Sequence, residues 1–117
     1  MIFRSEDCYE RGSTTPGAHG EILIHEFTPK SELEFGQCTL FCTIKIGPGG
    51  GIPYHPHMEE MEYYSIIQGI ATYTQDDVVY TLKAGDTAKC NYGSSHGIEN
   101  KSDEDVLLVA LMFKREK

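Results

Sequence analysis

Long hydrophobic segments are missing from this sequence of 117 residues. The longest apolar run, residues 106–113, is far shorter than the roughly 20 residues that cross a bilayer as a helix. The first twelve residues, MIFRSEDCYERG, also contain no apolar core of the kind that a secretory signal needs. We therefore expect no membrane partner and no secretion, and we predict a cytoplasmic protein.

Basic residues are scarce as well. The sequence has 10 Lys and Arg against 18 Asp and Glu, which gives a formal net charge of -8 at pH 7. Binding to the phosphates of a nucleic acid requires a basic face, so the charge argues against a nucleic-acid partner. The acidic residues gather at 59–62, 76–77 and 103–105, where we expect a solvated surface at every position except Glu62.

The four cysteines contain no C-x-x-C pair. Without a secretion signal they are expected to be reduced thiols rather than disulfides. Cys38 and Cys42 share parity with Ile44, so on a strand all three point the same way, and small buried hydrophobes are the favoured interpretation of the two thiols.

No segment has the pattern of a long helix. Glycine and proline interrupt the chain often, and short stretches rich in β-branched and aromatic residues lie between them, which is typical of an all-β fold. Strands are predicted at residues 21–27, 38–46, 52–57, 62–68, 70–75, 78–82, 87–91, 95–100 and 106–113. Many short strands separated by turns predict a sandwich or a barrel.

The length suits one domain over residues 1–117. Residues 1–37 are expected to form an N-terminal arm and the first strand, and residues 38–113 the core barrel. Residues 1–20 are weakly patterned, and the sequence does not decide whether they form an arm, a lid or a dimer contact. Residues 75–77 predict a hairpin turn, whereas 83–86 and 101–105 are expected to be polar connections.

Two histidines, His55 and His57, lie one residue apart in the predicted strand 52–57. Alternate residues of a strand share a face, so both imidazoles can meet one ion. Glu62 has the wrong parity for one straight strand, but a turn or bulge over residues 58–61 resets the face and lets its carboxylate aim at the same point. His96, after a turn at Gly93, is a fourth candidate donor.

Three imidazoles and one carboxylate suit a divalent transition ion, with ligand distances of about 2.0 to 2.2 Å. This donor set accepts manganese, iron, nickel, zinc or copper, and the sequence does not choose among them. Such an ion attracts an anionic oxygen and lowers the pKa of bound water.

The spacing of these residues resembles the cupin superfamily. Its first motif, G-x5-H-x-H-x3,4-E-x6-G, is matched by Gly49, His55, His57, Glu62 and Gly69. Its second motif, G-x5-P-x-G-x2-H-x3-N, is matched by Gly85, Gly93, His96 and Asn100, with Asn91 in place of the proline. The resemblance implies a double-stranded β-helix, or jelly-roll barrel, that is closed around a metal held by His55, His57, Glu62 and His96. It leaves the first 37 residues unaccounted for.

Tyr64 and Ile66 share the parity of Glu62, so they are expected to line the pocket beside it. Tyr64 is the candidate acid, base or substrate contact, although a core tyrosine with a backbone partner is the alternative. Cys42 and Ile44 are candidate pocket residues on the neighbouring strand, whose inner face the pattern does not fix. Asn100 is expected to bond to the backbone.

Two classes of function compete. The first is a metal-dependent enzyme that acts on a small polar or anionic molecule as an oxygenase, isomerase, lyase or decarboxylase. The alternative is a non-catalytic module that binds a metal or a small molecule, because a fold does not fix a function. A structural protein without metal is a third class. Small cupins often pair through exposed sheet edges, so a homodimer is expected.

Overall fold

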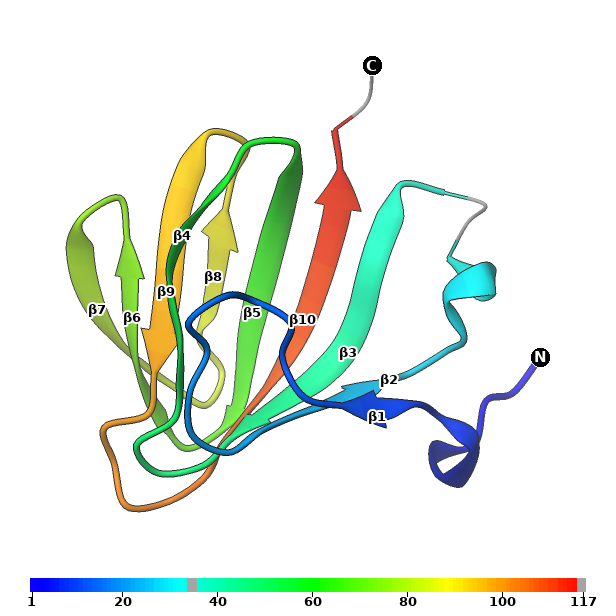
Figure 1. Ribbon diagram of the computed structural model, residues 1–117, viewed down its shortest axis with the longest axis horizontal. Coiled ribbons are helices and arrows are strands. Elements are labelled where there is room, and N and C mark those ends of the chain that lie inside the picture. The colour runs from blue at the N-terminus through cyan, green and yellow to red at the C-terminus, as the bar shows by residue number, and fades with distance from the viewer. Residues whose placement is uncertain (34–35, 116–117) are drawn as a thin grey trace.

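Ten β-strands and two short 3-10 helices carry the described part of the chain, which in this computed structural model comprises residues 1–33 and 36–115 (Figure 1). The strands are β1 Glu10–Arg11, β2 Ile22–Glu26, β3 Cys38–Ile46, β4 Gly51–His57, β5 Glu60–Gln68, β6 Ile70–Gln75, β7 Val78–Lys83, β8 Thr87–Cys90, β9 Ser94–Glu99 and β10 Val106–Lys114. The helices are η1 Ser5–Asp7 and η2 Lys30–Glu32. Neither of these two helices approaches the length that a bilayer crossing requires.

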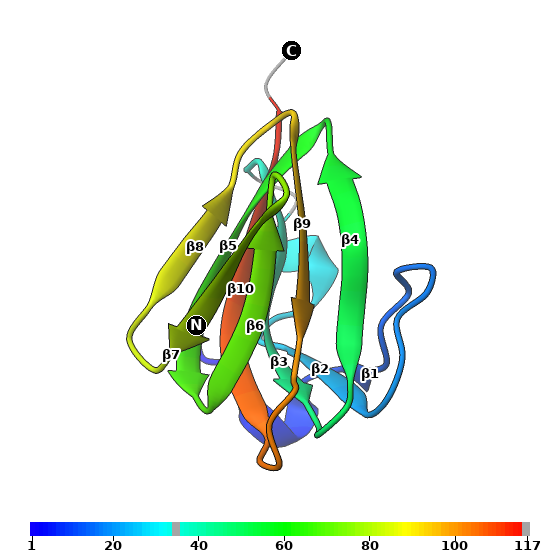
Figure 2. The ribbon, with the colours of Figure 1, turned by 90° about the vertical axis from the view of Figure 1, so that its left-hand side faces the viewer.

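The strands form two antiparallel sheets that face each other (Figures 1 and 2). One sheet has the order β1-β2-β3-β10-β5-β8, and the other has the order β4-β9-β6-β7. Alternate residues of β3 and β5 are buried between the sheets, as period-two patterning requires. The core therefore lies between the sheets, and the jelly-roll architecture expected from the sequence is confirmed.

The observed strands differ little from the predicted ones. β3 and β6 have the predicted bounds, and most other ends shift by one residue. Two differences matter for the site. β5 begins at Glu60 rather than Glu62, so the turn after His57 is only two residues long. The weakly patterned segment 1–20, whose role the sequence left open, contains β1 and η1.

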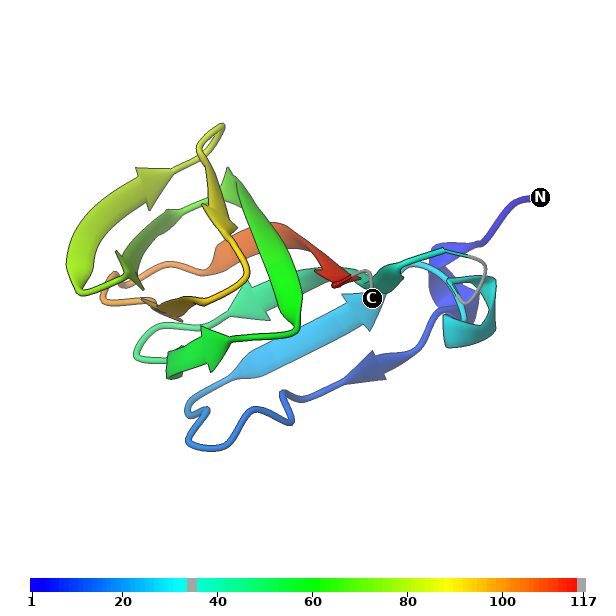
Figure 3. The same ribbon diagram turned by 90° about the horizontal axis from the view of Figure 1, so that it is seen from above.

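The two sheets do not close into a barrel, which corrects the closed shell expected from the sequence. Among the described residues, no ladder joins the sheets, because β4 pairs only with β9 while β3 continues into β2 and β1. Seen from above, the sheets splay apart on the side of β4, β2 and β1 (Figure 3). The chain between β1 and β2 lies on this open side and is tied to β4 by a bridge between His19 and Gly51.

The hairpin between β6 and β7 turns at Asp76 and Asp77, as predicted. Both residues have positive φ angles, 48° and 68°, which is the conformation of the tight turn that matches the twist of two antiparallel strands. Oδ1 of Asp76 also accepts a hydrogen bond from the Ser95 N–H at 3.0 Å. The turn therefore helps to fix the start of β9, the strand that carries His96.

A bulge in β4 decides which way its histidines point. The register with β9 shifts between Ile52 and His55, so both residues face the core although they are three positions apart. The bulge presses against Gly97, where an added Cβ would lie 2.7 Å from the Tyr54 nitrogen and 2.9 Å from its Cα. Only glycine leaves room for this backbone approach.

Candidate metal centre

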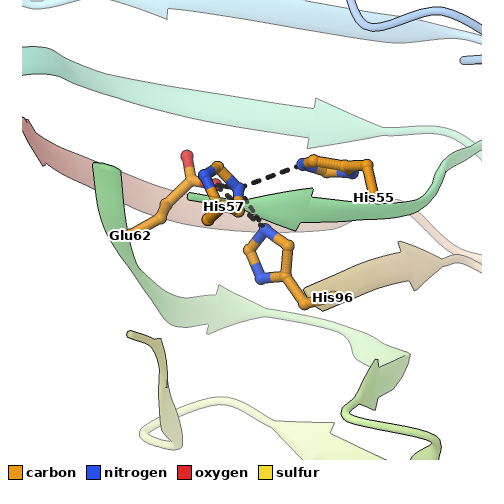
Figure 4. A group of neighbouring side chains, drawn as sticks. All are labelled: His55, His57, Glu62 and His96. Atoms are coloured by element: carbon orange, nitrogen blue, oxygen red, sulfur yellow. Dashed lines mark hydrogen bonds and ion pairs between the residues drawn. The ribbon is translucent and has the colours of Figure 1, made fainter. Parts of the chain in front are cut away.

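Four side chains from three strands converge at one point (Figure 4). His55 and His57 come from β4, Glu62 from β5 and His96 from β9. His55 and His96 are direct partners across the β4–β9 ladder, which puts both imidazoles on the same face. The two-residue turn after His57 brings Glu62 back to them from the facing sheet, so the structure brings together all four residues that the sequence singled out.

The ligand atoms have the spacing of a metal shell. Nε2 of His57 lies 3.0 Å from Nε2 of His55 and 2.9 Å from Nε2 of His96. Oε1 of Glu62 lies 3.3 Å from His57 Nε2 and 3.2 Å from His96 Nε2. With metal–ligand distances of about 2.1 Å, neighbouring donors are separated by about 3.0 Å in octahedral and about 3.4 Å in tetrahedral geometry. The donor set therefore fits a divalent transition ion.

The hydrogen bonds behind the histidines orient their lone pairs. Nδ1 of His55 lies 2.7 Å from the Pro53 carbonyl, which can only accept, so Nδ1 carries the proton. The Tyr73 hydroxyl donates to Oε1 of Gln75 at 2.7 Å and so accepts from Nδ1 of His96 at 2.9 Å. In both histidines Nε2 is left with a lone pair that points at the cluster. Such outer bonds are a regular feature of metal-binding histidines.

The electrostatics of the cluster favour a cation. Burial raises the pKa of the Glu62 carboxyl, but hydrogen bonds and charge interactions with His57 and His96 outweigh it and hold the pKa below its usual value. Burial lowers the pKa of His96, which is 1% exposed. A carboxylate and imidazole lone pairs thus face one another in a buried place, where only a positive charge satisfies all of them.

Tyr64 packs directly against this cluster. Its ring stacks on that of His96, with centroids 4.9 Å apart and an interplanar angle of 18°. Burial, followed by the charge of Glu62, raises the pKa of Tyr64 well above its usual value, so the hydroxyl keeps its proton. Tyr73 lies edge-on to His96, with ring centroids 5.6 Å apart, and was missed by sequence reasoning, because the pairing of β6 with β9 is not visible in a sequence.

A cavity of about 490 Å³ opens beside the donors. His55, His57 and Glu62 line it, together with Tyr64 and Ile44. The other two candidate pocket residues lie elsewhere: Cys42 and Ile66 are 0% and 1% exposed in the core and are not part of this wall. The roles of these four residues toward a ligand stay predictions.

The cavity wall also contains residues of the N-terminal segment 1–20, whose role the sequence did not decide. Arg11 of β1 and residues 13–16 line the cavity, and Lys30 of η2 joins them. Nothing in the local pattern pointed to them, since a strand of two residues has no periodicity to detect.

The turn over residues 91–94, where Asn91 replaces the proline of the second motif, keeps a defined conformation. The Ser94 N–H donates to the Asn91 carbonyl at 3.0 Å, and Gly93 adopts a φ of 84°, so a tight turn precedes His96. The predicted backbone role of Asn100 is confirmed: its Nδ2 donates to the carbonyls of Ile46 at 2.9 Å and Glu104 at 2.7 Å.

Comparisons with known proteins agree with this geometry. The oxalate-binding protein of Thermotoga maritima is 30% identical over 114 residues, which cover 97% of this chain and 93% of that protein. A crystal structure described as a predicted oxalate decarboxylase, also from Thermotoga maritima, superposes with a TM-score of 0.85 at 27% identity and covers 97% of this chain and 99% of that one.

A sugar phosphate isomerase of the cupin superfamily from Silicibacter pomeroyi has the same fold, with a TM-score of 0.79 at 18% identity over 97% of this chain and 76% of that one. The sequence model of the cupin domain matches residues 42–112, which include all four candidate metal ligands. The chain therefore belongs to the cupin family.

Proposed function

We propose that this protein binds one divalent transition ion through His55, His57, Glu62 and His96 and presents it to a small carboxylate anion of the oxalate class. The observation that carries the proposal is the convergence of four donor atoms that all lie within 4.8 Å of one another, with neighbouring donors 2.9 to 3.3 Å apart. Hydrogen bonds made by Nδ1 of His55 and His96 fix the Nε2 lone pairs of these two residues.

The anion class is supported by the relatives. One protein with 30% identity over nearly the whole chain is named for oxalate binding, and one structure with 27% identity is described as a predicted oxalate decarboxylase. Charge supports the same class, because a divalent ion with three neutral imidazoles and one carboxylate keeps a net positive charge that attracts an anion.

The residues of this chain have separate tasks in this proposal. His55, His57, Glu62 and His96 hold the ion, which supplies a Lewis acid for a carboxylate oxygen when it is bound. Ile44 contributes an apolar side chain to the cavity wall. An apolar wall strengthens the attraction between a bound anion and the charged groups around it.

We propose as a second candidate that the protein is an enzyme of the decarboxylase type. The observation in its favour is Tyr64, which lines the cavity together with Glu62 and carries a hydroxyl. Hydrogen oxalate yields formate and carbon dioxide when its C–C bond breaks and the electron pair takes a proton at carbon. The Tyr64 hydroxyl is the proposed donor of that proton, and the acidic proton of the substrate restores it, so no oxidant or reductant is needed.

Elemental analysis and calorimetry test the first proposal. Protein purified without added metal is loaded with Mn²⁺ and titrated with oxalate, alongside His55→Ala and a control variant, His19→Ala, whose histidine lies outside the cluster. We expect one ion per chain and saturable oxalate binding in the wild type and in His19→Ala, and neither in His55→Ala. Oxalate binding that is equal with and without metal would contradict the proposal.

Turnover separates the two candidates. Formation of formate from oxalate by the wild type, lost in Tyr64→Phe with oxalate affinity kept, supports the enzyme. Tight oxalate binding without formate supports the binding protein. The homodimer, the cytoplasmic location and the lack of a nucleic-acid partner, all expected from the sequence, stay predictions.

A further inference from the structure

The cavity beside the four candidate metal ligands has a second polar wall, built by the N-terminal segment. Arg11 lies on β1, at the edge of the six-stranded sheet, where it pairs with Ile24. Arg11 and the hydroxyl residues Ser13, Thr14 and Thr15 line the same cavity as His55, His57 and Glu62. Figure 3 shows this segment on the open side of the molecule, next to β4.

A buried carboxylate fixes Arg11 in place. Glu26 is 3% exposed, and its Oε2 lies 3.3 Å from Nε of Arg11. Its other oxygen, Oε1, has no hydrogen-bond donor among the described residues and lies 3.4 Å from Nζ of Lys30. A buried carboxylate is costly unless it is paired, so Glu26 holds Arg11 at this end of the cavity, whereas Lys30, whose side chain is 61% exposed, adds a weaker attraction.

Most of the guanidinium remains available. Nε donates to Glu26, and Nη1 donates to the Gly12 carbonyl at 3.1 Å. Within the described residues Nη2 makes no hydrogen bond, so three of the five N–H groups of Arg11 have no protein acceptor. The side chain is 21% exposed. A fixed, partly buried guanidinium with free donors is well suited to bind a carboxylate.

The charges of the two ends act over the same interior. Burial, followed by the charge of Glu62, raises the pKa of the Cys42 thiol, whereas the charge of Arg11 lowers it. A bound divalent ion, Arg11 and Lys30 together carry four positive charges. The carboxylates of Glu60 and Glu62 on the cavity wall, and of Glu26 beside Arg11, carry three negative charges, so one positive charge remains. The loaded cavity thus attracts an anion, and its positive groups are the ion at one place on the wall and Arg11 at another.

We propose that Arg11 is a specificity residue: it binds the negatively charged end of the ligand that points away from the metal, and so selects dicarboxylates over monocarboxylates. This inference rests on the proposed metal and anion binding. Glu26 is the positioning residue that holds Arg11, and the N-terminal segment is part of the site. The ligand class is a small dicarboxylate, with one end on the ion and the other on the guanidinium.

A matched pair of ligands tests this inference by calorimetry on the Mn²⁺-loaded full chain. Oxalate and oxamate have nearly the same shape, but oxamate replaces one carboxylate by a neutral amide. We expect the wild type to prefer oxalate, and Arg11→Gln to lose about 10- to 100-fold in oxalate affinity, the range of a hydrogen bond to a charged group. Its oxamate affinity should change less than about threefold, and its Mn²⁺ affinity should be unchanged.

A double variant excludes a purely structural role. Arg11→Gln combined with Glu26→Gln removes the charge pair without leaving a buried carboxylate alone. If Arg11 only neutralised Glu26, this double variant would regain the wild-type preference for oxalate. The inference expects the preference to stay lost while the melting temperature recovers.

The outcomes are distinguishable. A preference for oxalate that survives in Arg11→Gln, or equal losses for both ligands, overturns the role of Arg11 and leaves the metal and anion proposal intact. A wild type that takes up Mn²⁺ but neither ligand overturns the proposed function, and the inference with it.

Discussion

The Tyr73 hydroxyl accepts a hydrogen bond from Nδ1 of His96 at 2.9 Å while it donates its own proton to Gln75. This relay fixes the tautomer of His96, and with it the lone pair that faces the donor cluster. Replacing Tyr73 by Phe keeps the ring and removes the acceptor. We expect the affinity for Mn²⁺ to fall about 10- to 100-fold, as measured by competition with a chelating dye, because outer-shell partners have effects of that size.

Tyr80→Phe is the matched control for that experiment. Tyr80 is the direct partner of Tyr73 across the β6–β7 ladder, but it is 49% exposed and lies on the edge strand β7. Its substitution should leave metal affinity unchanged. Equal losses in the two variants would mean that the β6–β7 hairpin as a whole, and not the hydroxyl beside His96, controls the site.

Gly97→Ala should disturb both the fold and the metal site. The added Cβ would lie 2.7 Å from the Tyr54 nitrogen, and backbone cannot yield as a flexible side chain does. Overpacking of this kind costs about 1 to 3 kcal/mol. We expect a lower midpoint of urea unfolding and weaker metal binding, because the bulge that aims His55 has to shift. Gly36→Ala, where an added Cβ meets nothing within 4 Å, is the control and should leave both unchanged.

Metal binding should be visible as thermal stability. An ion that binds only the folded chain, at 100 times its dissociation constant, adds about 2.7 kcal/mol. For a chain of this size that raises the melting temperature by on the order of 10 °C. We expect a chelator to reverse the rise, and scanning calorimetry to find no such rise in His96→Ala. A rise of equal size in that variant would place the ion elsewhere.

The buried thiols should make the protein sensitive to alkali. Burial, followed by the charge of Glu62, raises the pKa of Cys42 to about 12, and burial raises that of Cys90 to about 11. The folded state therefore keeps protons that the unfolded chain releases near pH 9. This contribution to stability is complete below pH 9 and is lost as the pH rises towards 12.

Urea unfolding at pH 8 to 11 checks this expectation. The free energy of unfolding should decrease above pH 9. Cys42→Ala should lower it at every pH, since it leaves a cavity, but with a shallower decrease above pH 9. A slope identical to that of the wild type would show that Cys42 has no part in the alkaline loss.

The sequence allowed much of the site to be predicted because its information is local. Period-two parity placed Glu62, Tyr64 and Ile66 on one face, and the structure buries them to 5%, 3% and 1% exposure. The turn after His57 was expected to reset the face, and it does so in two residues. The fold followed from the strand pattern and from the two spaced motifs.

What the sequence could not provide depends on contacts between distant strands. Ile52 and His55 both face the core only because β4 bulges against Gly97 of β9. The local periodicity of a sequence does not predict strand pairing of this kind. The same holds for Tyr73 behind His96. Arg11 could not be predicted for another reason. A two-residue strand in a segment rich in Gly, Ser and Thr has no pattern, and the position of Arg11 is set by its ion pair with the buried Glu26.

The position of an ion in a crystal grown with Mn²⁺ tests the central claim most directly. An anomalous difference map should contain one strong peak about 2.0 to 2.2 Å from Nε2 of His55, His57 and His96 and from a carboxylate oxygen of Glu62. A map with no peak among these four atoms, or with the ion bound elsewhere on the chain, would contradict the account.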